Sequence, residues 1–401
     1  MENIYRAFEK LFSPFITGNY WKFKVVVVAT LYCILTSMPK YQDLFESSLS
    51  QQTYYIKYLE NFEALNDQIE NPFEPNKFHI SSHSSKLSFR FVPALLVKAL
   101  PIHDLYSRML ALYILNNLAG IICFLCLMTI TYRYSKNRLF SALVALNFAV
   151  LYFGKSFFHD TSLWNDGIAF AFLLLSITTR NRLLTFLFLL AAFFTDERAL
   201  FGGVLVYVYF KLTDKDTNYP HRFPFISISV NDLPYILSFV GYGIIRLSLK
   251  DFFRMETPIG WDSGVALFLR LRKGYPLKLN FLAIITLYKF AWIPILWSMW
   301  ALRTKKIVLM MALSSLLALI VISLSVEDIT RTIIYSFMTL VTAFYIFHEN
   351  PTLLKIKEPA YGAFILLFAN FCFPTVAVVS NFIDVIPYFT KFVSAFSIWI
   401  I

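Results

Sequence analysis

Long apolar segments separated by short polar gaps recur from one end of this chain to the other. The apolar runs are continuous rather than alternating, which is typical of helices, and about 20 such residues suffice to cross a bilayer. The charges in the gaps sort by sign. Basic residues fill every second gap, at Arg133 to Arg138, Arg180 to Arg182, Lys211 to Arg222, Arg303 to Lys306, and Lys355 to Lys357. Acidic residues occupy the gaps between them, at Asp43, Asp160, Asp196 with Glu197, and Glu327 with Asp328. Because basic loops stay in the cytoplasm, we expect the acidic gaps on the outer face.

Composition supports a membrane protein. Of the 401 residues, 58% are hydrophobic and 15% are charged, whereas a soluble domain averages about 25% charged residues. In lipid every backbone group must be satisfied within its own segment, so the spans are predicted to be helical. We therefore expect an all-α polytopic bundle of about eleven or twelve spans. The net charge of +11 is assigned to the cytoplasmic loops and membrane lipids, and not to nucleic acid.

The predicted organisation is one transmembrane domain, residues 25–401, after a cytoplasmic interfacial helix in residues 1–24. Long outer loops are expected at about 39–104 and 250–279. Apolar residues spaced by three and four in the first of these loops predict two amphipathic helices, near 50–69 and 86–100, lying on the outer surface. The remaining spans are predicted at about 25–38, 105–130, 139–158, 163–178, 233–249, 280–302, 307–324, 332–347 and 360–380, and residues 387–401 form either a twelfth span or an interfacial segment.

The stretch from Leu183 to Phe210 has two interpretations. As one span, it places Asp196, Glu197 and Arg198 near the bilayer centre, at about 2.5–3.5 kcal/mol each. That reading also moves Lys305 and its basic neighbours to the outside. As two short spans of about 20 Å each, it leaves the three charges at the outer boundary and keeps the sign rule. We favour two short spans.

Three outer acids are candidate catalytic groups. Asp43 follows the first span by five residues, where partial burial would tune it as a general base; a solvated loop acid is the alternative. Asp160, beside His159, would hold an acceptor hydroxyl or a divalent cation, or else cap the next helix. Asp166 falls in the first turn of that helix, where stabilisation of the helix dipole is the favoured role. Asp196 belongs to a charged link that needs partners or a water-filled cavity, or that closes a hairpin by an internal ion pair.

Basic residues on the same face suggest phosphate binding. Arg331 is a candidate fork for phosphate, with pairing to Asp328 or Glu327 as the alternative. The second long outer loop carries a basic cluster, Arg270, Arg272 and Lys273, where short outer loops normally avoid such charge. This cluster suits a phosphate or pyrophosphate at the headgroups, or else nonspecific attraction to anionic lipid.

This layout resembles the GT-C superfamily of polytopic glycosyltransferases that use polyprenyl-phosphate-linked sugars. The resemblance is carried by Asp43, by His83 to Lys86 leading into Arg90 to Pro93, by Asp160, by Asp196-Glu197-Arg198, and by Asp328-Ile329-Thr330-Arg331. It implies that an acid of the first outer loop is the general base and that outer basic residues bind the lipid phosphate. Asp43 matches the first role, and Arg270, Arg272, Lys273 and Arg331 match the second. The superfamily often has two adjacent acids, whereas here Glu46 follows Asp43 by three residues.

We therefore expect a glycosyltransferase of the bacterial inner membrane, with its active site on the outer face. It would move a sugar from a polyprenyl-phosphate donor to a lipid-linked or cell-surface glycan, with Asp43, or else Asp160 or Asp196, as the general base that deprotonates the acceptor. The residues expected to bind substrate are Arg90, Glu197, Arg198, Arg270, Arg272, Lys273, Asp328 and Arg331. No cofactor is expected, with a divalent cation as the alternative. A polysaccharide polymerase or ligase and a flippase or transporter of lipid-linked glycan are the rival functions.

Overall fold

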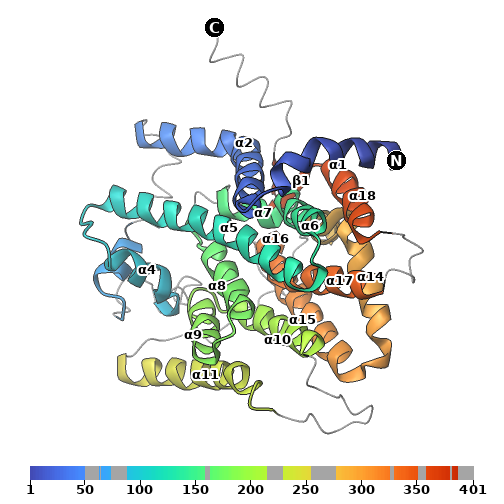
Figure 1. Ribbon diagram of the computed structural model, residues 1–401. Helices are drawn as coiled ribbons and strands as arrows, with labels where there is room; N and C mark the ends of the chain where they lie inside the picture. Colours follow the sequence, from blue (N-terminus) through green and yellow to red (C-terminus); the bar gives the residue numbers. More distant parts are fainter. Residues whose placement is uncertain are drawn as a thin grey trace.

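The computed structural model describes residues 1–49, 63, 65–73, 88–158, 163–214, 229–253, 277–325, 329–350, 358–379 and 382–386, with only the backbone described for 37–49, 253, 277–280, 325, 377–379 and 382–386. Apart from one two-stranded hairpin, the described fold is all-α (Figure 1). The N-terminal helices are α1 (Glu2–Ile16), α2 (Trp21–Leu49), α4 (Phe91–Lys98), α5 (Leu105–Ser135), α6 (Arg138–Val150), α7 (Tyr152–Phe158), α8 (Asp166–Thr178), α9 (Arg182–Phe193) and α10 (Ala199–Thr213).

The C-terminal half contains α11 (Leu233–Phe253), α13 (Leu277–Tyr288), η3 (Lys289–Ala291), α14 (Trp292–Ala301), η4 (Leu302–Thr304), α15 (Lys306–Ser325), α16 (Ile329–Ile333), η5 (Ile334–Ser336), α17 (Phe337–Glu349) and α18 (Pro359–Phe371). Strands β1 (Thr375–Val379) and β2 (Phe382–Ile386) follow and pair antiparallel, with Val379 opposite Phe382.

Helix α5 shows how the sequence produces a membrane-spanning element. Asp104 caps its start by accepting a hydrogen bond from Ser107 N at 2.8 Å, as N-cap carboxylates do. Apolar side chains then recur every fourth residue on its outward face, at Leu110, Ile114 and Leu118, each about half exposed. Its 31 residues reach about 46 Å. An outward apolar stripe on a helix of this length indicates contact with lipid.

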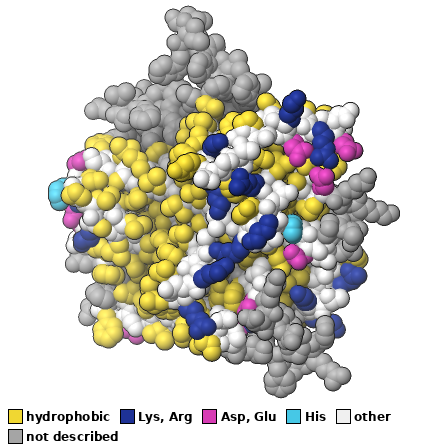
Figure 2. Space-filling model, viewed as in Figure 1, with side chains coloured by type: hydrophobic (Ala, Val, Ile, Leu, Met, Phe, Trp, Pro, Cys, Tyr) yellow, Lys and Arg dark blue, Asp and Glu magenta, His cyan; other side chains and the backbone are white. Residues whose placement is uncertain are grey.

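The membrane assignment holds for several helices together. Within the described residues, four helices are long and apolar enough to cross a bilayer, namely α5, the α13–α14 unit, α15 and the α16–α17 unit, and the bent pair α6–α7 makes a fifth if it is one span. Shorter apolar helices, α8, α9, α10 and α18, complete the bundle. Figure 2 shows hydrophobic side chains over a broad part of the surface, beside a band of Lys and Arg. An exposed apolar area of this extent marks a protein embedded in a membrane.

The predicted span over 139–158 is broken. It forms α6 and α7, which meet at an angle of 67° around Leu151. The bend brings the backbone of Gly154 so close to α6 that a Cβ atom there would lie 2.6 Å from the carbonyl oxygen of Ala149. Because no side chain fits into that gap, glycine allows the two helices to meet at this angle.

One helix runs past its predicted span, and one predicted span ends early. Helix α2 continues to Leu49, beyond the predicted end of the first span at residue 38, so the helix extends into the predicted outer loop. The predicted span over 360–380 ends with α18 at Phe371, and residues 375–379 form β1 instead. Pro374 cannot continue a helix, and the valine-rich segment after it favours a strand.

The charged gaps gather at opposite ends of the helices. Arg133 donates to the carbonyl oxygens of Ile177 and Thr178, where α8 ends, and Arg138 donates to the link between α1 and α2. The other end of α8 begins at Asp166 and holds the charged link that follows α9. This arrangement is what the alternating sign of the loops predicts, and it places the candidate site at the end of α8 away from Arg133.

Candidate functional site

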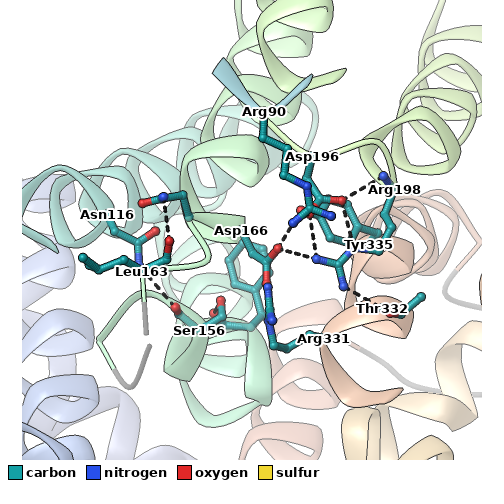
Figure 3. A network of polar contacts seen from close by, with 12 residues as sticks. Arg90, Asn116, Ser156, Leu163, Asp166, Asp196, Arg198, Arg331, Thr332 and Tyr335 are labelled. Carbon is teal, nitrogen blue, oxygen red and sulfur yellow. Dashed lines mark hydrogen bonds and ion pairs between the residues drawn. The ribbon is translucent and has the colours of Figure 1, made fainter. Parts of the chain in front are cut away.

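Six charged side chains from four distant segments form one buried cluster (Figure 3). They are Arg90 before α4, Asp166 at the start of α8, Asp196, Glu197 and Arg198 between α9 and α10, and Arg331 in α16. Three are cations and three are anions, so the formal charges cancel. We call this set the charge cluster.

Asp166 is the centre of the charge cluster. Its two carboxylate oxygens accept hydrogen bonds from Arg198 Nη2 at 2.8 Å, Arg331 Nε at 2.7 Å and the Tyr335 hydroxyl at 3.0 Å. The side chain is 4% exposed. A carboxylate so enclosed is stable in its charged form only because its donors replace water. Asp166 therefore ties α8 to α16 and to the link before α10.

The link between α9 and α10 is a tight turn closed by its own side chains. Asp196 Oδ1 accepts bonds from the backbone N–H of Arg198 at 2.9 Å and from Arg198 Nε at 2.8 Å, and Asp196 Oδ2 accepts from Arg198 Nη2 at 2.7 Å. Arg198 also donates to Thr332 Oγ1 at 3.1 Å, and its guanidinium lies over the Tyr335 ring at 5.1 Å from the centroid. The internal ion pair expected of a hairpin is thus present, and it continues outward to α16.

Arg90 closes the other side of the turn. Its guanidinium forms a two-pronged contact with Glu197, at 2.9 Å and 2.8 Å, and meets Asp196 Oδ2 at 2.9 Å. The backbone N–H of Val92 donates to the Phe194 carbonyl oxygen at 3.4 Å, and the rings of Phe91 and Phe194 lie 4.7 Å apart. The segment around Arg90 is therefore held against the α9–α10 link by both backbone and rings.

The side chains of the charge cluster differ in how deeply they are buried. The Asp196 side chain is fully buried, whereas that of Glu197 is 28% exposed, so Glu197 lies at the rim. Burial alone would raise the pKa of Asp196, but the guanidiniums of Arg198 and Arg90 outweigh that effect and hold it below its usual range. A carboxylate held in this way is a weak base, so Asp196 is better suited to positioning the two arginines than to accepting a proton.

Arg331 lies in α16 and not in a loop as expected. It is 8% exposed, and its guanidinium lies over the Trp164 ring at 4.7 Å from the centroid. Its described ion pair is with Asp166, which the sequence suggested only as a helix-dipole acid. The structure thus brings Arg331 into the same cluster as the α9–α10 link.

The structure describes the side chains of some predicted site residues and not of others. It joins Arg90, Asp196, Glu197, Arg198 and Arg331 in the charge cluster. Asp43 belongs to α2, but its side chain lies outside the described residues, as do Asp160, Arg270, Arg272, Lys273 and Asp328. The roles of Asp166 and Tyr335 were not predicted from the sequence. The signal for Asp166 was an acid inside the first turn of an apolar helix, where such charges are usually functional.

Comparison with known proteins gives no relative. No protein-family model, no curated protein and no solved structure matches this chain. The class that fold and site define is therefore an α-helical membrane protein with a buried charge cluster at one end of its helices.

Proposed function

We propose that this chain is a GT-C-type glycosyltransferase of the bacterial inner membrane, crossing it about eleven or twelve times. It would transfer a sugar from a polyprenyl-phosphate donor to a lipid-linked or cell-surface glycan on the outer face. One observation carries the proposal: Arg90, Asp166, the 196–198 link and Arg331 converge at the end of α8 opposite Arg133. A membrane protein rarely buries six charges unless they serve a substrate or a pathway.

The chemistry assigned to this region follows from the leaving group. A lipid phosphate leaves as an anion and needs charge neutralisation more than a proton, which is a task for arginine. Glu197 is the most exposed member of the charge cluster and Arg90 is its partner, and we assign this pair to the phosphate side. Basic residues of the second outer loop, Arg270, Arg272 and Lys273, are assigned to the same phosphate.

The acceptor hydroxyl must lose a proton to a carboxylate with free lone pairs. Asp196 is bonded on both oxygens to guanidiniums, so we assign the base to Asp43, with Asp160 as second choice. No metal step is invoked. The remaining acids of the charge cluster, Asp166 and Asp196, are assigned to holding the arginines in place.

The decisive experiment is a transfer assay in proteoliposomes with a radiolabelled polyprenyl-phosphate sugar and a lipid-linked glycan acceptor. Asp43→Asn and Arg90→Met should each lower the rate about 100-fold or more, as removal of a base or a charge stabiliser does. Arg303→Met is the matched control, because Arg303 is exposed and lies in η4, outside the charge cluster. Full activity in Asp43→Asn and Arg90→Met would remove the proposal.

The same assay separates the rival functions. A flippase moves the labelled lipid across the bilayer without forming a glycosidic bond. A polymerase or ligase gives products that grow by whole repeat units. Either result would replace the transferase by the rival it describes.

A further inference from the structure

Four basic side chains lie together at the end of the bundle that carries Arg133, opposite the charge cluster. Lys22 and Arg138 both lie over the Trp21 ring, at 5.8 Å and 5.9 Å from its centroid. Lys22 Nζ donates to Thr129 Oγ1 at 3.0 Å, and Thr129 lies one helical turn before Arg133 on α5. We call Lys22, Lys24, Arg133 and Arg138 the basic patch.

Three members of the basic patch are bonded to helix ends. Arg133 donates to the last carbonyl groups of α8. Lys24 and Arg138 donate to carbonyl groups at the end of α1 and in the link that follows it. The C-terminal end of a helix carries partial negative charge, so these bonds hold the cations in place. They supply no full negative charge, and the patch therefore keeps its four formal positive charges.

Lys22 is the member with the least compensation. It is half-buried, and its one recorded hydrogen bond within the described chain goes to the Thr129 hydroxyl. It lies close enough to Arg133 for their two positive charges to repel each other. Among the described residues, no member of the basic patch forms an ion pair with a carboxylate. An anion between Lys22 and Arg133 would remove this repulsion.

An apolar track leads to this pair of cations on the same face of α5. Leu118, Ile122 and Leu125 precede Thr129 and Arg133 at successive spacings of four, three, four and four residues, which places all five on one side of the helix. Leu118 and Ile122 are 47% and 37% exposed. From Leu118 to Thr129 the helix rises about 16 Å, close to half of a hydrocarbon core of about 30 Å. The track is thus as long as one leaflet is thick.

We propose that the basic patch and this face of α5 bind one anionic phospholipid from the leaflet at the Arg133 end, which the signs of the loops predict to be cytoplasmic. Its phosphate lies between Lys22 and Arg133, and one acyl chain follows Ile122 and Leu118. Lys22 belongs to α2, and Arg133 joins α5 to the end of α8, so the lipid would hold three helices together. This inference goes beyond the proposed function, because the lipid is neither sugar donor nor acceptor, and it stands whether or not sugar is transferred.

Binding is measured with the full chain in a neutral detergent, titrated with short-chain phosphatidylglycerol. Lys22→Gln and Arg133→Gln should each weaken binding about fivefold, since each removes one cation beside the phosphate. Glutamine keeps an N–H donor for the Thr129 hydroxyl or for the carbonyl groups of α8. Lys22→Arg and Arg133→Lys keep the charge and should stay within about twofold of the unmodified chain. Unchanged affinity in both glutamine variants would overturn the inference.

Thermal unfolding separates this site from a purely structural role of Lys22. Without anionic lipid, Lys22→Gln should unfold at the same temperature as the unmodified chain or at a higher one, because the repulsion from Arg133 is gone. Phosphatidylglycerol should then raise its unfolding temperature less than it raises that of the unmodified chain. An equal drop in unfolding temperature with and without phosphatidylglycerol would mean that Lys22 serves only its bond to Thr129, and would overturn the inference.

Arg182→Gln is the matched control for net charge. Arg182 begins α9 at the same end of the bundle, is exposed, and donates to Asn231 Oδ1 at 2.7 Å. It lowers the net charge by the same amount as Arg133→Gln and should change affinity by less than about twofold. An equal loss in the two variants would show general attraction between a basic surface and anionic lipid, with no defined site.

The acyl chain is tested on the apolar track. Ile122→Thr should weaken phosphatidylglycerol binding about threefold. Ile114→Thr is its control, because Ile114 is 48% exposed on the same stripe but lies about 22 Å from Thr129 along the helix, beyond one leaflet. Inorganic phosphate or glycerol 3-phosphate that bound as tightly as phosphatidylglycerol would show a site for free phosphate, and phosphatidylcholine that bound as tightly would remove the need for an anion. Either result would overturn the inference.

Discussion

At the scale of single residues, Asp166 is the most informative side chain, because it accepts from two arginines and a tyrosine while buried. Asp166→Asn keeps the shape but removes the charge that balances Arg198 and Arg331. Leaving buried charges without a partner costs about 3–5 kcal/mol. We expect a loss of this order in the free energy of unfolding, measured by denaturant titration in detergent.

Asp104→Asn is the control for that substitution. Asp104 also begins a helix, but it is exposed and caps α5, and asparagine caps helices about as well as aspartate. It should change stability by less than about 0.5 kcal/mol. If Asp166→Asn cost no more than Asp104→Asn, Asp166 would serve only the helix dipole, which is the role that its position in the sequence first suggested.

Lys289, which is half-buried, and Lys155, which is fully buried, give stability predictions of opposite sign. Lys289 donates to three backbone carbonyl oxygens, of Val150, Asn370 and Phe373, at 2.8–3.1 Å. Lys155 is 1% exposed and has one described hydrogen bond, to Thr36 Oγ1, beside the Tyr32 ring. Lys289→Met should destabilise the protein by about 2–3 kcal/mol, because carbonyl groups at two helix ends lose their donor.

Lys155→Met should instead leave stability unchanged or raise it by about 1 kcal/mol, because an ammonium without a carboxylate is removed from an apolar site. The Thr36 hydroxyl keeps its bonds to Tyr32 and Cys33 in that variant. Thermal unfolding of both variants in the same detergent compares their two stability changes directly. A loss in Lys155→Met as large as that in Lys289→Met would show that this buried charge has a partner it needs.

At the scale of secondary-structure elements, the break between α6 and α7 depends on Gly154. An added methyl group would meet Ala149 backbone atoms at 2.6–3.0 Å, and backbone cannot move aside as a flexible side chain can. Gly154→Ala should therefore cost about 1–3 kcal/mol. Gly243→Ala is the matched control: it has no atom within 4 Å of its added Cβ, so it should be neutral or stabilising by about 0.5–1 kcal/mol. Equal effects in the two variants, measured by thermal unfolding, would show that the bend does not require glycine.

The hydrophobic pattern and the charges of the sequence predicted most helices, but not the bends and junctions between elements. The start of α5, the span of α15 and the division of residues 183–210 into α9 and α10 agree with the apolar pattern. The bend at Leu151, the extension of α2 and the β1–β2 hairpin do not follow from hydrophobicity, because each depends on backbone geometry within or next to an apolar segment.

The candidate site was predictable in its parts and not in its centre. The 196–198 link was predicted as part of the site, because charges between two short apolar segments need partners. Their partner Asp166 was not identified, since its contacts with Arg331 and Tyr335 join residues 165 and 169 positions apart. Lys155 was not singled out because it lies inside the predicted span 139–158, although a charge inside a span is itself a signal of a functional position.

At the scale of the whole molecule, the remaining question is the path of the chain through the bilayer. Helices α9 and α10 contain 12 and 15 residues, or about 18 and 22 Å, short of a hydrocarbon core of about 30 Å. If they form two short spans meeting at the 196–198 link, Lys305 lies in the cytoplasm. If 183–210 crosses only once, Lys305 lies outside.

Cysteine labelling decides between these paths. In a Cys372→Ser background, because Cys372 is the one exposed cysteine among the described residues, His103→Cys, Arg180→Cys and Lys305→Cys each add one exposed thiol. A membrane-impermeant maleimide applied to intact spheroplasts should label His103→Cys, and should reach Arg180→Cys and Lys305→Cys only after lysis. Labelling of Lys305→Cys in intact cells, with Arg180→Cys still protected, would mean that 183–210 is a single crossing. The charge cluster would then lie within the bilayer, where a polar glycan acceptor has no access, and the sugar-transfer proposal would lose its site while the helical fold stood unchanged.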